Sequence, residues 1–223
     1  MKQSSNPLSW EELSKLASIE ESRIEGPNNP YASLRLFGKK EKELKVTLYR
    51  DHHAWCPYCQ KVWLWLEWKQ IPYRIKKVTM RCYGRKESWY TKKVPSGMLP
   101  AIEIKNKIVT ESDEILLILE QAYGPLGTPL NDPYLLNLRN LERQIFRAWC
   151  IWLCNPSISD RQESRRKEQF QLLALRVEEY LQKTGEQFLD PIKTASEAPH
   201  PGSGDVIFIP YLERMNASLA YYK

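Results

Sequence analysis

The segment Trp55-Cys56-Pro57-Tyr58-Cys59 constrains the fold of this chain more than any other feature. Alternating apolar residues at 44–48 predict a strand before it, and residues 60–67 predict a helix after it. Cys56 then lies at or just before a helix N-terminus. Pro57 takes the first helical position, where a missing N–H costs nothing. A strand, Cys-Pro-Tyr-Cys and a helix in this order are typical of the thioredoxin-like fold.

The predicted position of Cys56 favours a reactive thiol. The unpaired N–H groups of a first helical turn and the helix dipole stabilise an anion, which lowers the pKa of a thiol placed there. Cys59 lies one turn inside the helix and can approach the same sulfur. The pair therefore predicts redox or thiol-transfer chemistry, with Cys56 as the nucleophile and Cys59 as an optional resolving thiol.

Two other interpretations of the cysteine pair stay open at this point. A C-x-x-C pair can be half of a zinc site, with His52 and His53 as further ligands. A closed structural zinc site usually has four ligands from two such pairs, and the sequence holds no second one. The remaining interpretation is an inert pair. We expect no metal.

Composition and charge exclude several classes of protein. Of 223 residues, 42% are hydrophobic and eight are tryptophan, which is typical of a globular protein. No apolar run is long enough to cross a bilayer. The net charge is +6, but Lys and Arg alternate with acids, as in residues 39–43 and 161–168. This pattern predicts a solvated basic surface and no nucleic-acid partner.

The N-terminus has no apolar signal core and is too acidic for a typical transit peptide. Five cysteines, an odd number, favour a reducing compartment over secretion. We expect a cytoplasmic location, or the plastid stroma if the chain comes from a plant.

The sequence divides into four regions. Residues 1–43 predict an extension, residues 44–123 a thioredoxin-like domain, residues 124–129 a Gly/Pro-rich linker and residues 130–223 an all-helical domain. Within the extension, residues 8–21 are predicted to form a short amphipathic helix.

Within the second region, a further strand is predicted at 73–78 and a short polar helix or loop at 84–93. A hairpin follows at 100–109, and a helix begins after it. Thr110 and Asp113 have the spacing of a capping box for that helix.

The helical region is predicted to contain three helices, the first two of them amphipathic. The first ends at Asn155-Pro156, the second near Gly185, and the third begins after Gly204. Cys150 and Cys154 share the first helix with several tryptophans and are predicted to be buried, inert thiols. Cys82 is isolated, either exposed or structural.

This order of domains resembles the soluble glutathione transferases. Residues 94–100 resemble the family's Gly-x-Val-Pro segment, which implies that Pro100 is cis and that the Leu99 backbone pairs with glutathione. Glu111 and Ser112 resemble the acid–serine pair that receives the γ-glutamyl group. In that role Ser112 and nearby N–H groups bind the carboxylate, and Glu111 binds the ammonium. Plain helix capping is compatible with the same residues.

Trp89 precedes Leu99 by ten residues, a spacing like that of omega-class transferases. In that class a lysine three residues before the tryptophan binds the glycine carboxylate. The resemblance assigns this role to Lys86, with Arg85 as a neighbour that could replace it.

Residues 51–59 and 210–219 look like the iota-class transferases of cyanobacteria and plants, a resemblance that extends over about residues 7–223. It implies a cysteine-type enzyme that reduces mixed disulfides or dehydroascorbate with glutathione as co-substrate. No Tyr or Ser stands at the Cys56 position, so conjugation of the hydroxyl type is less expected. The residues to which the resemblance assigns glutathione binding are Trp55, Pro57, Tyr58, Lys86, Leu99, Pro100, Glu111 and Ser112.

Two features depart from the iota pattern. The helix entry at 202–205 has Gly where the family places a capping Ser or Thr, and the chain stops at Lys223, where family members continue. We therefore expect a truncated version of the fold, with an uncovered apolar run at 219–222.

The expected partners are glutathione, small or protein mixed disulfides, and a second copy of the chain as a homodimer. Competing hypotheses are a dithiol oxidoreductase served by thioredoxin-type reductants, and a non-catalytic module that binds glutathione, a metal or a cluster.

Overall fold

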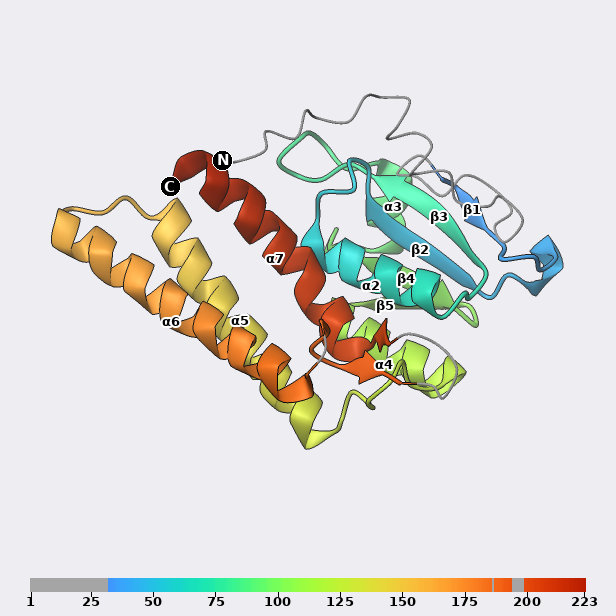
Figure 1. The fold of residues 1–223 in the computed structure, drawn as a ribbon. Coiled ribbons are helices and arrows are strands. Elements are labelled where there is room, and N and C mark those ends of the chain that lie inside the picture. The colour runs from blue at the N-terminus through green and yellow to red at the C-terminus, as the bar shows by residue number, and fades with distance from the viewer. Residues whose placement is uncertain (1–31, 186, 194–198) are drawn as a thin grey trace, which may run out of the picture.

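A computed structural model describes residues 32–185, 187–193 and 199–223; the predicted helix at 8–21 lies outside this part of the chain. The N-terminal half contains a five-stranded mixed sheet with its helices (Figure 1). Its elements are β1 (Leu34–Arg35), η2 (Glu41–Glu43), β2 (Val46–Asp51), α2 (Pro57–Trp68), β3 (Tyr73–Val78), α3 (Ser88–Lys93), β4 (Ala101–Ile104), β5 (Lys107–Thr110) and α4 (Ser112–Tyr123).

The strand order β1-β3-β2-β4-β5 confirms the thioredoxin-like prediction. β2 and β3 are parallel and are joined by α2, whereas β4 and β5 form an antiparallel hairpin beside β2. Lys105 and Asn106, at the hairpin turn, have φ values of 49° and 62°. A two-residue turn with both values positive matches the twist of the strands it joins. β1 adds an antiparallel edge strand from within the predicted extension.

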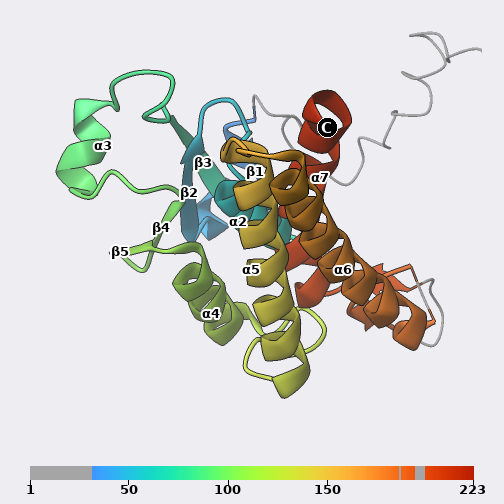
Figure 2. The same ribbon diagram turned by 90° about the vertical axis from the view of Figure 1, so that its left-hand side faces the viewer.

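The alternation of side chains along β2 builds two separate cores. Leu48 is buried on the face covered by α2 and α4, while Tyr49 is buried with Tyr90 of α3 on the other face. Figure 2 shows α3 on the opposite side of the sheet from α2. The segment 84–93, predicted as a short polar helix or loop, therefore contains the helix α3 that covers one face of the sheet.

Three long helices make up most of the C-terminal half (Figure 1). Its elements are α5 (Pro133–Cys154), α6 (Asp160–Thr184), β6 (Pro191–Ile192), β7 (His200–Pro201) and α7 (Ser203–Tyr222). α5 ends before Asn155-Pro156, as predicted, and α6 ends at Gly185, which has the left-handed φ of 65° that favours glycine. None of the described helices is long and apolar enough to cross a membrane.

α7 begins at Ser203, slightly earlier than predicted, because Asp205 caps it. The Asp205 carboxylate accepts hydrogen bonds from the backbone N–H of Leu189 (2.7 Å), Asp190 (3.0 Å) and Gly202 (3.1 Å). A Cβ on Gly202 would lie 2.4 Å from the Asp190 carbonyl oxygen. This close approach explains the glycine that departs from the family pattern.

The prediction that Cys150 and Cys154 are both buried is wrong. Cys150 is half-buried and Cys154 is exposed. The buried face of α5 is formed by residues 141, 145, 148 and 152. Both cysteines lie two positions beyond members of that row and so point away from it. Cys82 is exposed.

Candidate functional site

Cys56 stands where the sequence predicts it, at the N-cap of α2. Its φ and ψ of −66° and 116° are extended, and Pro57 takes the first helical position. Its carbonyl oxygen accepts the first helical hydrogen bond, from Gln60 N at 3.0 Å. The Cys56 side chain is half-buried, whereas Cys59 is only 1% exposed.

The two thiols differ in the direction of their pKa shifts, as predicted. The pKa of Cys56 is lowered, first by a hydrogen bond from the Cys59 thiol and further by the backbone N–H groups of Cys59 and Tyr58, against burial. Burial raises the pKa of Cys59 well above its ordinary value, and the bond to Cys56 adds to this. The helix N-terminus acts as expected, but the largest favourable contribution comes from the neighbouring thiol.

Asp51 is a site residue that the sequence reasoning missed. It ends β2, is fully buried, and its Oδ2 accepts hydrogen bonds from Trp55 N (2.6 Å) and Cys56 N (3.2 Å). Its other carboxylate oxygen has no hydrogen-bond partner among the described residues. One feature of the sequence could have indicated Asp51. It is an acidic residue at the end of an apolar strand, where burying an unpaired charge normally costs too much free energy.

The site could offer ligands to a metal ion. One ligand atom each from Asp51, Cys56 and Cys59 lie within 4.8 Å of one another, the one such group among the described residues. His52 and His53 are exposed, and the ring of His53 instead packs on Tyr83 with centroids 4.5 Å apart. Three ligand atoms fall short of the four of a closed structural zinc site. Among the described residues, His52 and His53 therefore do not complete the zinc site that the sequence left open.

Strand register brings the predicted glutathione residues to the edge that carries Cys56. Tyr49 of β2 pairs with Ala101 of β4, and Ala101 pairs with Thr110 of β5. The residues just after β2, just before β4 and just after β5 therefore meet at one end of the sheet. Leu99-Pro100 and Glu111-Ser112 occupy two of these positions, and the loop to Cys56 occupies the third. The Leu99–Pro100 peptide bond is cis, as the resemblance implied.

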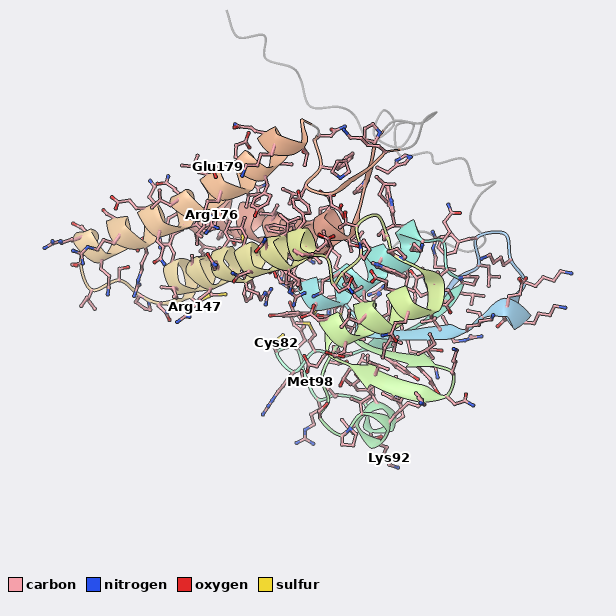
Figure 3. All side chains as sticks on the ribbon, turned by 90° about the horizontal axis from the view of Figure 1, so that it is seen from below. Cys82, Lys92, Met98, Arg147, Arg176 and Glu179 are labelled. Carbon is pink, nitrogen blue, oxygen red and sulfur yellow. The ribbon has the colours of Figure 1, made fainter. Side chains whose placement is uncertain are left out.

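The segment before Leu99 is held by α3. Tyr90 Oη donates to the carbonyl of Met98, a residue labelled in Figure 3. Lys86 Nζ donates to the Thr79 carbonyl at 3.0 Å, and its side chain passes within 3.2 Å of where a Cβ on Gly97 would lie. Lys86 thus flanks the predicted peptide-binding edge.

The capping box predicted from Thr110 and Asp113 is wrong. β5 continues through Thr110, and the N-cap of α4 is Glu111, which has a φ of 66° and no side-chain capping bond. Asp113 instead binds Arg139 of α5 and, at 2.5 Å, Lys61 of α2. Ser112 is the first residue of α4 and is 6% exposed. Its hydroxyl therefore lies beside the N–H groups of the first turn, which have no partner within the helix.

Tyr58 faces the helical half of the molecule, whereas Trp55 is 50% exposed. The ring of Tyr58 lies edge-on to Tyr211 of α7 and to Phe146 of α5, with centroids 5.6 and 6.4 Å away. The guanidinium of Arg143 lies 4.7 Å from the rings of both Phe146 and Tyr211. The Cys-Pro-Tyr-Cys turn is therefore at the boundary of the two halves.

Comparisons with known proteins find glutathione transferases. The family described as Glutathione S-transferase, N-terminal domain, matches residues 55–122. The Arabidopsis thaliana protein named Glutathione S-transferase DHAR3, chloroplastic, is 41% identical over 76 residues, which are 33% of this chain and 28% of that protein. Glutathione S-transferase DHAR2 of the same plant is 25% identical over 170 residues, 75% of this chain and 70% of that protein.

Solved structures show the same fold. A glutathione S-transferase from the Antarctic clam Laternula elliptica superimposes with a TM-score of 0.60 at 23% identity, covering 76% of this chain and 77% of that one. The Tau class glutathione S-transferase from mango, Mangifera indica, gives a TM-score of 0.62 at 20% identity, with 79% and 78% covered.

Proposed function

We propose that this chain is a member of the glutathione S-transferase family and a glutathione-dependent thiol transferase and reductase that uses the Cys56 thiolate. One observation carries the proposal. The Cys56 sulfur sits at the N-cap of α2, where the Cys59 thiol and the backbone N–H groups of the first turn lower its pKa. A thiolate is the attacking species in thiol–disulfide exchange, and these contacts stabilise it.

The reaction proceeds in two exchanges. The Cys56 thiolate attacks the glutathionyl sulfur of a mixed disulfide, forms a Cys56–glutathione disulfide, and releases the other sulfur as a thiolate that takes up a proton. The thiolate of a second glutathione then attacks the glutathionyl sulfur on Cys56. Glutathione disulfide leaves and the Cys56 thiolate is restored, so the N-terminus of α2 stabilises the same anion in both exchanges.

Glutathione binds along the edge formed by the starts of β4 and α4. The Leu99 backbone pairs with its cysteinyl backbone, Ser112 and the N–H groups of α4 receive the γ-glutamyl carboxylate, and Glu111 receives the ammonium. Lys86 binds the glycine carboxylate in this arrangement. Trp55, Pro57, Pro100 and Tyr58 border the reacting sulfur.

The relatives also suggest the specific activity, the location and the assembly of this protein. Matches named DHAR, and the iota-like Cys-Pro-Tyr-Cys turn, support deglutathionylation and dehydroascorbate reduction as the activities to test. The chain matches only 28% of the length of the Arabidopsis DHAR3 protein, so both activities are proposals. Relatives named chloroplastic and cytosolic support a plastid or cytoplasmic site, and a homodimer is the assembly typical of the family.

A dithiol route is the second candidate, because the Cys59 thiol is hydrogen-bonded to the Cys56 sulfur and could attack a disulfide formed there. Replacing each cysteine by serine separates the routes, measured with one glutathionylated substrate and glutathione. We expect Cys56→Ser to be inactive, since a hydroxyl stays protonated near pH 7 and is a poor nucleophile toward sulfur. Cys59→Ser should keep most of the activity. Equal loss in both variants would establish the dithiol route and overturn the glutathione-regenerated cycle.

A further inference from the structure

Arg214 is a buried arginine of α7 whose side chain joins the C-terminal half to the loop that carries Cys56. It is 5% exposed. Its Nε donates to the Trp55 carbonyl at 2.9 Å and its Nη2 to the Ala54 carbonyl at 3.3 Å. Its Nη1 donates to the side-chain oxygen of Gln60, one turn after Cys56. The guanidinium thus binds the chain on both sides of the thiol.

The peptide unit between Trp55 and Cys56 is held at both of its polar ends. Its carbonyl accepts from Arg214, and its N–H donates to Asp51 at 3.2 Å. Ala54, just before it, has a φ of 57°, a conformation that residues other than Gly, Asn and Asp rarely adopt. The loop is therefore fixed in an unusual conformation by contacts from two directions.

Arg214 is itself anchored on α7. Nη1 also donates to Glu213 Oε2 at 2.6 Å and to the Pro210 carbonyl at 3.3 Å, and the guanidinium lies 5.0 Å from the centre of the Trp55 ring. A planar guanidinium with five N–H donors can contact these acceptors together, with the two hydrogens of Nη1 shared among three of them, which the single ammonium of a lysine cannot do. Figures 1 and 2 both show α7 beside α2.

We propose that Arg214 is a positioning residue for Cys56, and that α7 sets the reactivity of this thiol through it. By fixing the Trp55–Cys56 peptide, Arg214 keeps the sulfur in line with the N–H groups of the first turn of α2. The inference rests on the proposed role of Cys56 as nucleophile. It adds that a helix of the C-terminal half is needed for the thiolate to form at neutral pH.

The test measures the reactivity of Cys56 itself, without glutathione. In a Cys59→Ser background the tryptic fragment 51–61 contains one cysteine, so its alkylation by iodoacetamide can be followed by mass spectrometry across pH. The compared variants are Arg214→Gln and Arg214→Lys. The charged or titrating groups that act on the Cys56 sulfur are Asp51 of β2 and Cys59 of α2. From α7, Arg214 and its partner Glu213 face the loop and the helix turn beside it. Cys59 is replaced in every protein compared.

Arg35→Gln is the matched control. Arg35 is also buried, at 2% exposure, and also holds α2, but at the far end, through two hydrogen bonds to Glu67 at 2.8 and 2.7 Å. A purely structural role for Arg214 predicts that both substitutions lower Tm and that neither changes the alkylation profile. A positioning role predicts a changed profile for Arg214 alone.

We expect Arg214→Gln to move the midpoint of the alkylation profile to higher pH. Alkylation at pH 7 should slow about threefold or more, because a half-unit rise in the pKa of a mostly protonated thiol lowers its thiolate population about threefold. Arg214→Lys should lie between Gln and the parent, and it carries the test if Arg214→Gln does not fold. Arg35→Gln should match the parent profile. A folded Arg214 variant with the parent profile, or an equal shift in Arg35→Gln, would overturn the proposal. A shifted profile in a protein without thiol-transferase activity would contradict the proposed function and leave the positioning role standing.

Discussion

At the scale of residues, two cysteines that are one helical turn apart have pKa values shifted in opposite directions. Cys56 is the N-cap residue and is half-buried, whereas Cys59 lies inside the helix and is buried. The Cys59 thiol donates to Cys56, so it lowers the pKa of Cys56 while its own pKa rises. Cys59 therefore assists the nucleophile even where it never forms a disulfide.

This assistance predicts a difference between two substitutions at position 59. Cys59→Ala removes the donor, and the pKa of Cys56 should rise by about one unit, the size expected for losing a hydrogen bond to a charged group. Cys59→Ser keeps an O–H donor and should show a smaller rise. The pH profile of thiol-transferase activity measures both, since activity should fall at pH 7 and recover as pH rises. Identical profiles for the two variants would contradict this role.

A substitution at Ser112 should change how the activity depends on glutathione concentration. Ser112→Ala removes a buried hydroxyl at the start of α4, and the apparent KM for glutathione should rise roughly tenfold or more, as for a lost hydrogen bond to a carboxylate. Ser159→Ala is the control, because Ser159 caps α6 through a bond to Gln162 N at 3.3 Å. It should cost stability and leave KM unchanged. An unchanged KM in Ser112→Ala would place the γ-glutamyl site elsewhere.

Sequence patterns predicted some of these residues and not others. The cysteines and Pro57 belong to one short contiguous segment, whose spacing alone indicates a helix start. The cis Leu99–Pro100 bond was implied by the resemblance of residues 94–100 to the glutathione transferases. Arg214 acts on Cys56 only through the folded structure. Arg214 is 158 residues away from Cys56 along the chain (214 minus 56), so no local pattern could indicate it.

At the scale of elements, periodicity predicted the central strands, the hairpin and the long helices, because each buries one regular face. The ends of elements were harder to predict. Thr110 stays in β5 because it pairs with Ala101, and this pairing displaces the start of α4 to Ser112. The start of α7 depends on residues 189–190, which approach it only in the folded chain.

The start of α7 carries a stability prediction. Asp205→Ala removes the acceptor of three backbone N–H groups in a buried site and should lower the free energy of unfolding by about 3–5 kcal/mol. Asp132→Ala removes one capping bond at α5, to Tyr134 N at 2.7 Å, and should cost about 1 kcal/mol. Urea unfolding of the two variants measures the difference. Equal losses would mean that the Asp205 network does not hold α7.

At the scale of the whole molecule, the two halves share one core. The apolar cluster that includes Leu48 of the sheet and Trp65 of α2 continues into Ile145 of α5 and Phe208 of α7. The Gly/Pro segment at 124–129 is also fixed, since Ser203 N and Oγ both donate to the Leu126 carbonyl, at 2.8 and 2.7 Å. We expect the described parts to unfold together.

Phe208→Ala tests this cooperativity. Phe208 is 1% exposed, and its truncation should lower the free energy of unfolding by about 3–5 kcal/mol in a single transition. Tyr222→Ala, at a residue that is 68% exposed, should change it by less than about 0.5 kcal/mol. Helix content by circular dichroism and tryptophan fluorescence should report the same midpoint. Two separate transitions, with the sheet half unaffected, would contradict a shared core.

The central claim is that the Cys56 thiolate takes up the glutathionyl group, and one measurement tests it most directly. The Cys59→Ser protein is exposed to glutathione disulfide, its intact mass is recorded, and the fragment 51–61 is mapped. We predict one glutathionyl adduct, on Cys56, formed well before any on the exposed Cys82 or Cys154, and none at position 56 in Cys56→Ser. An unmodified Cys56 beside adducts on the exposed cysteines would contradict the account.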